Sequence, residues 1–276
     1  MSRIALFQTT SGIDPAANAR ALVAALEAAA AGGAAIVFTP EMTGLLDRDR
    51  VRAAGSIVGE ADDGVLAAAR EAAARLRLWV HLGSLALRPG GDETRYVNRA
   101  FLIDDRGAIR ARYDKLHLFD VDLATGGSWR ESSAYAPGAG AVVGETPAGR
   151  LGLSICYDLR FPDLYRALSD AGAEILAVPA AFTVPTGEAH WHVLLRARAI
   201  EAGCFVVAAA QTGTHEDGRA TYGHSLVIDP WGAVLLDMGA APGVGFADLD
   251  LARLHEVRSR IPALRHRRAI PAVTRA

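Results

Sequence analysis

Short apolar runs with the length of β-strands alternate with longer amphipathic stretches in the first part of the chain. Strands are predicted at residues 4–8 and 35–38. A helix is predicted from Asp14-Pro15 to about residue 31, because Asp accepts hydrogen bonds from free N–H groups and Pro suits a first helical turn. A second capped helix is expected from Asp62-Asp63 to about residue 76.

From Trp79 onward the pattern changes to consecutive strands, joined by turns that are rich in Gly, Pro and Asp. A loop from residue 116 to 140 separates them from the second half, which mixes helices with hairpins. The predicted elements are strands at 80–87, 96–103 and 108–113, a hairpin at 141–156, a helix at 162–171, a strand at 175–178, a helix at 188–202, a strand at 204–210, a hairpin at 225–236, a strand near 245–250 and a helix at 251–260.

Two of these runs are apolar on both faces. Residues 175–178 and 205–208 carry no polar side chain, which is typical of a sheet that is covered on both sides. Because helices separate some strands and tight turns separate others, we expect an α/β fold with mixed sheets and helices packed outside. No linker divides the 276 residues, so we expect one domain, residues 1–276, with a tail from about residue 262.

Composition and charge exclude several classes of protein. The chain is 51% hydrophobic, and its formal net charge of −2 gives no basic surface for nucleic acid. Two cysteines argue against a disulfide framework and fit a reducing compartment, so we expect a cytoplasmic protein. Glu27 and Gly32-Gly33 interrupt the alanine-rich stretch 21–38, and the apolar run at 4–8 is too short for a signal peptide, so no membrane segment is predicted.

Three polar residues lie at or just past the ends of apolar strands: Glu41, Lys115 and Cys156. Strand ends are where α/β folds usually carry ligand chemistry. A glutamate can remove the proton of a thiol, and a lysine can lower the thiol pKa and stabilise the oxyanion that forms when a carbonyl is attacked. The residues alone leave other readings open: Cys156 as a small core residue, Glu41 as a turn residue and Lys115 as a solvated strand end.

The segments around these residues resemble the three signature segments of the nitrilase superfamily of carbon–nitrogen hydrolases, in the family's order. They are residues 39–41 (TPE), 113–122 (YDKLHLFDVD) and 155–162 (ICYDLRFP). The resemblance implies a four-layer α-β-β-α sandwich of two mixed sheets packed face to face. It also implies that subunits pair, so we expect at least a homodimer.

The same resemblance assigns roles to individual residues. It implies that Glu41 is the general base, that Cys156 is the nucleophile, and that Lys115 and the backbone N–H of Tyr157 hold the oxyanion. Glu131, in the long loop, matches the second active-site glutamate of the amidase-like branches, which positions Lys115 and the substrate amide.

Downstream segments resemble one amidase branch, which contains the omega-amidases, acting on 2-oxoglutaramate, and the deaminated-glutathione amidases. These segments are residues 182–191, 195–201 and 222–225, and residues 208–215 look more like the deaminated-glutathione group. We therefore expect a cofactor-free thiol amidase that hydrolyses a small 2-oxo acid amide, deaminated glutathione first of all, through a thioester. The alternatives are an omega-amidase, an N-carbamoyl or aliphatic amide hydrolase, and a catalytically silent binding protein, against which the intact Glu41, Lys115 and Cys156 argue.

The expected substrate has a carboxylate, so a cation must meet it. Arg160 is the first candidate, because a guanidinium binds carboxylates bidentately; a salt bridge with Asp158 or Asp163 is the structural alternative. His190 and Trp191, predicted near the start of a helix, are candidates either for the substrate pocket or for the core.

Metal binding is not expected from the sequence. His117 and His224 would join a metal site only if further ligands converged on them. No cluster with ligand spacing is present, so no metal is predicted. Cys204, inside an apolar strand, is expected to be a core residue.

Overall fold

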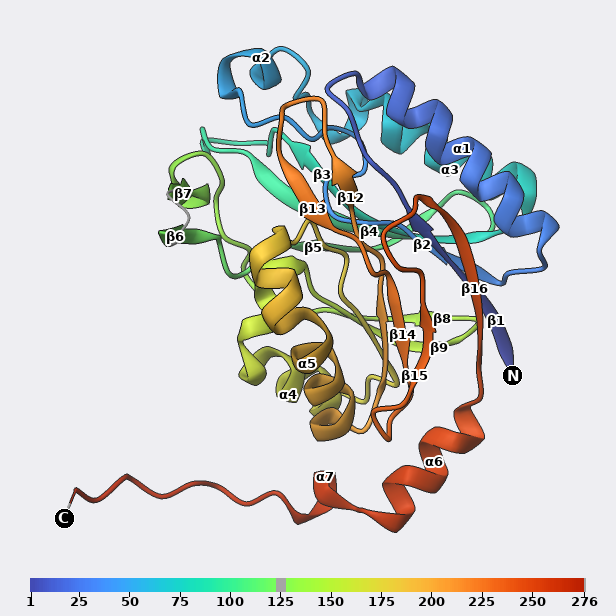
Figure 1. The fold of residues 1–276 in the computed structure, drawn as a ribbon, viewed down its shortest axis with the longest axis vertical. Helices are drawn as coiled ribbons and strands as arrows, with labels where there is room; N and C mark the ends of the chain where they lie inside the picture. The colour runs from blue at the N-terminus through green and yellow to red at the C-terminus, as the bar shows by residue number, and fades with distance from the viewer. Residues whose placement is uncertain (123–127, 276) are drawn as a thin grey trace.

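Two six-stranded β-sheets lie face to face, and helices cover their outer faces (Figure 1). The computed structural model describes residues 1–122 and 128–275. The first sheet has the strand order β16 (Gly243–Leu249), β1 (Ser2–Gln8), β2 (Ile36–Phe38), β3 (Trp79–Leu87), β4 (Val97–Ile103) and β5 (Ile109–Asp114). The second has the order β15 (Val234–Asp237), β14 (Leu226–Ile228), β11 (Phe205–Ala208), β10 (Ile175–Ala177), β9 (Gly149–Leu153) and β8 (Val143–Thr146).

Both sheets are mixed, as the sequence predicts. β1, β2 and β3 run parallel, and β16 and β4 pair antiparallel with the two outer members of that trio. In the second sheet β9, β10 and β11 run parallel, while β8, β14 and β15 pair antiparallel. The predicted α/β sandwich with two mixed sheets is confirmed.

The outer layers are helical. α1 (Pro15–Ala31) and α3 (Gly64–Leu76) cover the first sheet, and α4 (Pro162–Asp170) and α5 (Val184–Ala202) cover the second (Figure 1). α1 begins where it is predicted, because the Asp14 carboxylate accepts a hydrogen bond from the Ala16 N–H at 2.9 Å. α5 begins one turn before the predicted residue 188, since Pro185 fits its first turn.

The remaining elements are short. They are the helices α2 (Arg50–Ala54), α6 (Leu251–Arg260) and α7 (Ala263–His266), the 3₁₀ helices η1 (Glu60–Asp62), η2 (Glu131–Ser133) and η3 (Cys156–Arg160), and the hairpins of β6 (Asp120–Asp122) with β7 (Ser128–Arg130) and of β12 (Thr212–Thr214) with β13 (Ala220–Tyr222). The stretch 116–140 is therefore not all loop, although residues 123–127 lie outside the described part. None of the described helices has both the length and the apolar character needed to cross a membrane.

The hydrophobic core has two main parts. Between the sheets, Ile4, Phe38 and Leu102 of the first sheet share one buried cluster with Leu153 and Val206 of the second. A second cluster joins the outer face of the first sheet to α1 and α3. Burial on both faces explains why these strands are short, nearly continuous apolar runs.

Gly83, within β3, lies where the first sheet meets the end of β10. A Cβ atom at this position would lie 2.0 Å from the carbonyl oxygen of Thr39 and 2.6 Å from Cβ of Pro179. Only glycine leaves space for both segments. Its small size therefore lets the chain that carries Glu41 approach the segment of Pro179, whose carbonyl oxygen accepts the backbone N–H of Cys156 at 2.9 Å.

Candidate active site

The four side chains that the sequence predicts as catalytic line one cavity of about 510 Å³. Glu41 follows β2, Lys115 follows β5, Glu131 begins η2 and Cys156 begins η3. Strand ends and short loops from both sheets thus meet at one edge of the sandwich. This placement matches the expectation that strand ends carry the chemistry.

Lys115 is held between two carboxylates. Its Nζ atom lies 2.8 Å from Oε1 of Glu41 and 3.0 Å from Oε2 of Glu131. The Lys115 side chain is 2% exposed and that of Glu41 is 6% exposed, so the ammonium and its first partner are almost fully removed from water. A buried charge is tolerated only when it is paired and hydrogen-bonded, and both conditions hold here.

Asn98 is a site residue that the sequence analysis missed. Its Nδ2 atom donates to Oε1 of Glu41 at 3.0 Å and to Oε1 of Glu131 at 3.3 Å. The backbone N–H of Ala181 donates to the other oxygen of Glu41 at 3.0 Å. The sequence did contain a signal: Asn98 is a polar residue in the otherwise apolar strand predicted at 96–103, and it is fully buried.

The backbone at Cys156 is in the left-handed region, with φ of 48°. This conformation is uncommon for a residue with a Cβ atom and is found at sites where the surrounding structure enforces it. The hairpin predicted at 141–156 ends earlier than expected, because β9 stops at Leu153, and Cys156 lies beyond it at the start of η3. Within residues 1–122 and 128–275, no hydrogen bond uses the next N–H, that of Tyr157.

Asp158 fixes the segment of Cys156 relative to that of Lys115. Its buried carboxylate accepts hydrogen bonds from the Tyr113 hydroxyl at 2.6 Å, from the Ile155 N–H at 2.9 Å and from the His117 N–H at 3.0 Å. The His117 ring lies 2.7 Å from the same carboxylate. Asp158 therefore joins the end of β5 and the following loop to η3. A salt bridge with Arg160, which the sequence analysis offered as the alternative to substrate binding by that arginine, is not among the contacts of Asp158.

Burial and charge set the protonation of the cluster. Burial raises the pKa of Glu41, but the charge and hydrogen bond of Lys115 outweigh burial, and the pKa is lowered overall. Burial lowers the pKa of Lys115, but the charges of Glu131 and Glu41 outweigh burial and raise that pKa well above its usual value. Burial and the charge of Glu41 raise the pKa of Cys156 well above its usual value, against the opposing effect of Lys115. At neutral pH the cluster therefore holds a carboxylate, an ammonium and a neutral thiol.

The three residues predicted to bind substrate do not line the cavity themselves, although Arg160 lies over the rings of Tyr157 and Phe182, which do. Arg160, His190 and Trp191 are not among the described residues that line the cavity of Cys156. The Arg160 guanidinium lies 3.3 Å from Nδ1 of His190, which is exposed. Trp191 is fully buried, packs on Phe182 and donates from Nε1 to the His224 carbonyl at 2.8 Å. This position agrees with the core alternative for Trp191.

Four other arginines line the cavity instead: Arg48, Arg50, Arg130 and Arg219. Arg219 is paired with Asp217 at 2.8 Å, and Arg130 with Asp122 at 2.9 Å. Arg50 donates to the Ser133 hydroxyl and to the Arg130 carbonyl. In the described part of the chain no carboxylate lies within salt-bridge distance of Arg48 or Arg50, so these two guanidinium charges remain available to a ligand.

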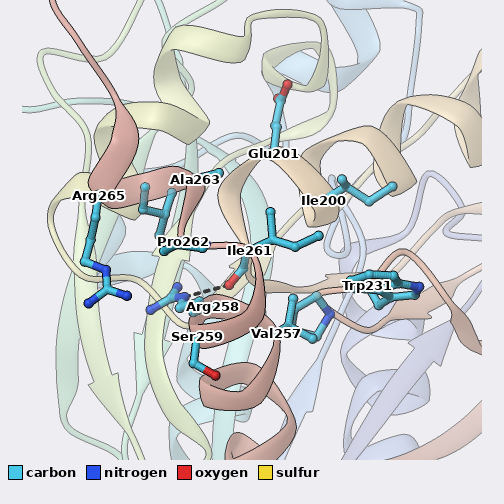
Figure 2. A pocket seen from close by; sticks show the side chains of 13 residues that line it. Ile200, Glu201, Trp231, Val257, Arg258, Ser259, Ile261, Pro262, Ala263 and Arg265 are labelled. Carbon is cyan, nitrogen blue, oxygen red and sulfur yellow. Dashed lines mark hydrogen bonds between the residues drawn. The ribbon is translucent and has the colours of Figure 1, made fainter.

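A second cavity of about 510 Å³ lies between the end of α5, the β14–β15 turn and α6 (Figure 2). Its walls are mostly apolar and include Ile200, Trp231, Val257 and Ile261. Arg258 in its wall donates hydrogen bonds to the carbonyls of Gly203 and Ala173. These bonds hold α6 against the segments that carry Gly203 and Ala173. No cysteine, histidine or paired lysine lines this cavity among the described residues, and it offers no comparable chemistry.

Comparisons with known proteins agree with the geometry. The family model described as carbon-nitrogen hydrolase matches residues 3–259. A deaminated glutathione amidase from Yersinia enterocolitica is 43% identical over 205 residues, covering 74% of this chain and 72% of that protein. A deaminated glutathione amidase from Homo sapiens is 41% identical over 271 residues, covering 96% of this chain and 82% of that protein.

A solved structure is similar over nearly the whole chain. The NitFhit protein of C. elegans superposes with a TM-score of 0.90 and 39% sequence identity. The match covers 97% of this chain and 65% of the NitFhit chain. This chain thus spans about two thirds of that longer protein.

The anchoring by Asp158 gives a stability prediction. Replacing Tyr113 by Phe removes the hydrogen bond to the buried Asp158 carboxylate at 2.6 Å and a longer one from the Leu116 N–H at 3.4 Å, and we expect the free energy of unfolding to fall by about 1.5–3 kcal/mol. Urea unfolding followed by circular dichroism measures this change. Tyr96→Phe is the matched control, because within the described residues its hydroxyl makes no hydrogen bond; equal losses in both variants would contradict the role assigned to Asp158.

Proposed function

Because the chain belongs to the carbon–nitrogen hydrolase family, we propose that it hydrolyses a small 2-oxo acid amide, deaminated glutathione first of all, through a thioester on Cys156. It is a hydrolase of carbon–nitrogen bonds in amides. The observation that carries the proposal is the Lys115 ammonium held between Glu41 and Glu131 in the cavity that Cys156 lines. The relatives named deaminated glutathione amidase support the choice of substrate.

In the first half of the reaction Glu41 acts as general base. The thiol of Cys156 is neutral at rest, so Glu41 takes its proton as the sulfur attacks the amide carbonyl carbon. Lys115 and the Tyr157 N–H stabilise the oxygen, which becomes negative in the tetrahedral intermediate. When the carbon–nitrogen bond breaks, the proton on Glu41 passes to the leaving amine, and the acyl group remains on the sulfur as a thioester.

The second half restores the enzyme. Glu41, ionised again, removes a proton from a water molecule that attacks the thioester carbonyl, and the same donors hold the oxyanion. The carbon–sulfur bond then breaks, the proton returns to the sulfur, and the carboxylic acid leaves. In this scheme Glu131 and Asn98 are positioning residues: they hold Lys115 and Glu41 without exchanging a proton with the substrate.

Arg48 and Arg50 are proposed to bind the substrate carboxylates. Deaminated glutathione carries a carboxylate at the 2-oxo acid end and another at the glycine end, and these two arginines are the cavity guanidiniums without a carboxylate partner in the described chain. Arg160, the first candidate from the sequence, lies beside His190 instead. We therefore assign carboxylate binding to the segment around α2 and not to η3.

A second copy of the chain is proposed as a partner. Exposed apolar side chains gather on α5 and on the β14–β15 hairpin, and they include Val193, Ile200, Trp231, Val234 and Leu235. The C-terminal segment also extends away from the body of the molecule (Figure 1) and carries further exposed apolar side chains. Apolar surface of this extent is typical of a protein–protein interface, which supports a homodimer.

A reducing, cytoplasmic setting is proposed because the nucleophile is a free thiol.

The activity is tested with four substrates: deaminated glutathione, 2-oxoglutaramate, a simple nitrile and a carbamoyl amino acid. We expect the highest kcat/KM with deaminated glutathione. A higher value with 2-oxoglutaramate would identify an omega-amidase. Release of carbon dioxide with ammonia from the carbamoyl compound would identify the N-carbamoyl alternative. Comparable kcat/KM for an amide without a 2-oxo acid head would overturn the substrate assignment.

The roles of the cluster are tested by substitution. We expect Cys156→Ala to lower kcat/KM by at least about 10⁴-fold, and Glu41→Gln to cost nearly as much, because nucleophile and base act as one unit. Circular dichroism should show an unchanged fold. Cys204→Ala is the matched control, since that cysteine is buried in the core away from the cavity; hydrolysis that survives Cys156→Ala would refute the mechanism.

The carboxylate clamp is tested by comparing KM values. We expect Arg48→Gln and Arg50→Gln to raise KM for deaminated glutathione by about tenfold or more with a smaller change in kcat, because each loses a charge-assisted hydrogen bond. Arg160→Gln serves as the comparison, and its KM should change less. A larger effect at Arg160 than at Arg48 and Arg50 would return the clamp to the position first expected from the sequence.

Self-association is tested by light scattering coupled to size-exclusion chromatography. We expect the parent chain to have the mass of a dimer, and Ile200→Glu to shift it to the monomer mass by burying a charge in the apolar contact. Val51→Glu, at an exposed valine on α2, is the control. A monomeric parent chain would contradict the proposal.

A further inference from the structure

Three potential metal ligands that are distant in the sequence meet on the surface of the second sheet. His192 lies on α5, His224 follows β13, and Asp237 ends β15. One ligand atom from each lies within 4.8 Å of the others. The sequence analysis expected no metal unless further ligands converged on His224, and the fold brings two such side chains to it.

The carboxylate of Asp237 lies between the two imidazoles. Nε2 of His192 is 3.0 Å from Oδ2 of Asp237, and Nδ1 of His224 is 2.9 Å from Oδ1. In a tetrahedral zinc site with ligand bonds near 2.0–2.1 Å, neighbouring donor atoms lie about 3.3 Å apart. The separations from the carboxylate to each ring are therefore close to those of a metal site, and the donor atoms of all three side chains lie within 4.8 Å of one another.

His224 is held firmly in this orientation. Its backbone is in the left-handed region, with φ of 54°, and its N–H donates to the Gly239 carbonyl at 2.7 Å. Its carbonyl accepts the indole N–H of Trp191 at 2.8 Å, and its ring stacks on Tyr222 with centroids 4.5 Å apart. The Asp237 carboxylate is also fixed, because it accepts the Gly239 N–H at 2.9 Å. A strained backbone with anchored ligands is typical of a preformed site.

We propose that His192, His224 and Asp237 form a binding site for a divalent transition-metal ion of the zinc type. Two imidazoles and one carboxylate are ligands that Zn²⁺, Co²⁺ and Ni²⁺ accept. The three side chains are about one third exposed in the single chain, and a fourth ligand completes the coordination. They lie on α5 and beside the β14–β15 hairpin, the same elements that carry the apolar side chains proposed to contact a second copy. None of the three is among the described residues that line the cavity of Cys156. The ion would therefore cross-link α5 to the β14–β15 hairpin and stabilise the fold without entering the reaction.

The test is metal binding by the full-length, tag-free chain carrying Cys156→Ala, so that the active-site thiol takes up no metal. After treatment with a chelator, titration with Zn²⁺ is followed by calorimetry, and Co²⁺ is used as a spectroscopic probe. We expect one Zn²⁺ per chain, a higher Tm with Zn²⁺, and cobalt absorption bands of four-coordinate type. His192→Ala, at a partly exposed position of α5 where alanine favours the helix, should weaken binding more than the ~10–100-fold that loss of an outer partner costs.

Further variants separate the site from other histidines. Asp237→Asn keeps a polar side chain of the same shape but removes the charge, and it should weaken Zn²⁺ binding as well. His255→Ala, at an exposed histidine on α6, should leave affinity and the rise in Tm unchanged. No binding at micromolar Zn²⁺, or binding that His192→Ala and His255→Ala affect equally, would overturn the proposal and leave a hydrogen-bonded His–Asp–His cluster. Since the readouts are binding and Tm, they do not depend on the proposed amidase activity.

Discussion

The burial of the Lys115 ammonium is the constraint on which the rest of the site depends. Removing such a charge from water costs several kcal/mol unless anionic partners surround it, and here Glu41 and Glu131 supply them at 2.8 and 3.0 Å. Glu41 follows β2 and Glu131 begins η2, so both ion pairs form only when the loop segment of η2 folds against the first sheet. Asn98, which contacts both carboxylates, completes a network in which each charged group fixes the others.

The same burial determines how the thiol reacts. Because burial and the Glu41 charge raise the pKa of Cys156, the thiol keeps its proton at rest, and in the proposed mechanism a base removes it during the attack. Glu41 suits the role of base proposed for it, because the charge and hydrogen bond of Lys115 lower its pKa and keep it ionised at neutral pH. The expectation that Lys115 lowers the thiol pKa is correct in sign, but burial and Glu41 together outweigh it. In the proposed mechanism the proton therefore moves from the sulfur to Glu41 only as the sulfur bonds to the carbonyl carbon and the carbonyl oxygen takes up the negative charge.

Buried contacts fix the segments that carry Glu41, Lys115 and Cys156 relative to one another. Asp158 joins β5 to η3 through buried hydrogen bonds, and Gly83 lets the segment before Glu41 approach Pro179. The left-handed backbone at Cys156 lies between two such contacts, because its N–H donates to the Pro179 carbonyl and the N–H of Ile155 donates to Asp158. Away from the cavity, a second strained residue, His224, is held in the same manner by Trp191 and Tyr222, which suggests that its ring also has an assigned position.

The sequence by itself determined most of the elements and the candidate reacting groups. Apolar runs, the Asp14-Pro15 cap and the turn residues are local signals, and they placed most strands and helices to within a few residues. Glu41, Lys115 and Cys156 became candidates through their positions at strand ends and through the resemblance of their segments to the nitrilase superfamily. Contacts between distant positions were decided by the tertiary structure alone. Trp191 lies in the core, Arg48 and Arg50 rather than Arg160 line the cavity, and His192 and Asp237 lie beside His224. Burial and ion pairing depend on which surfaces the two sheets bring together. A local sequence pattern does not contain that information.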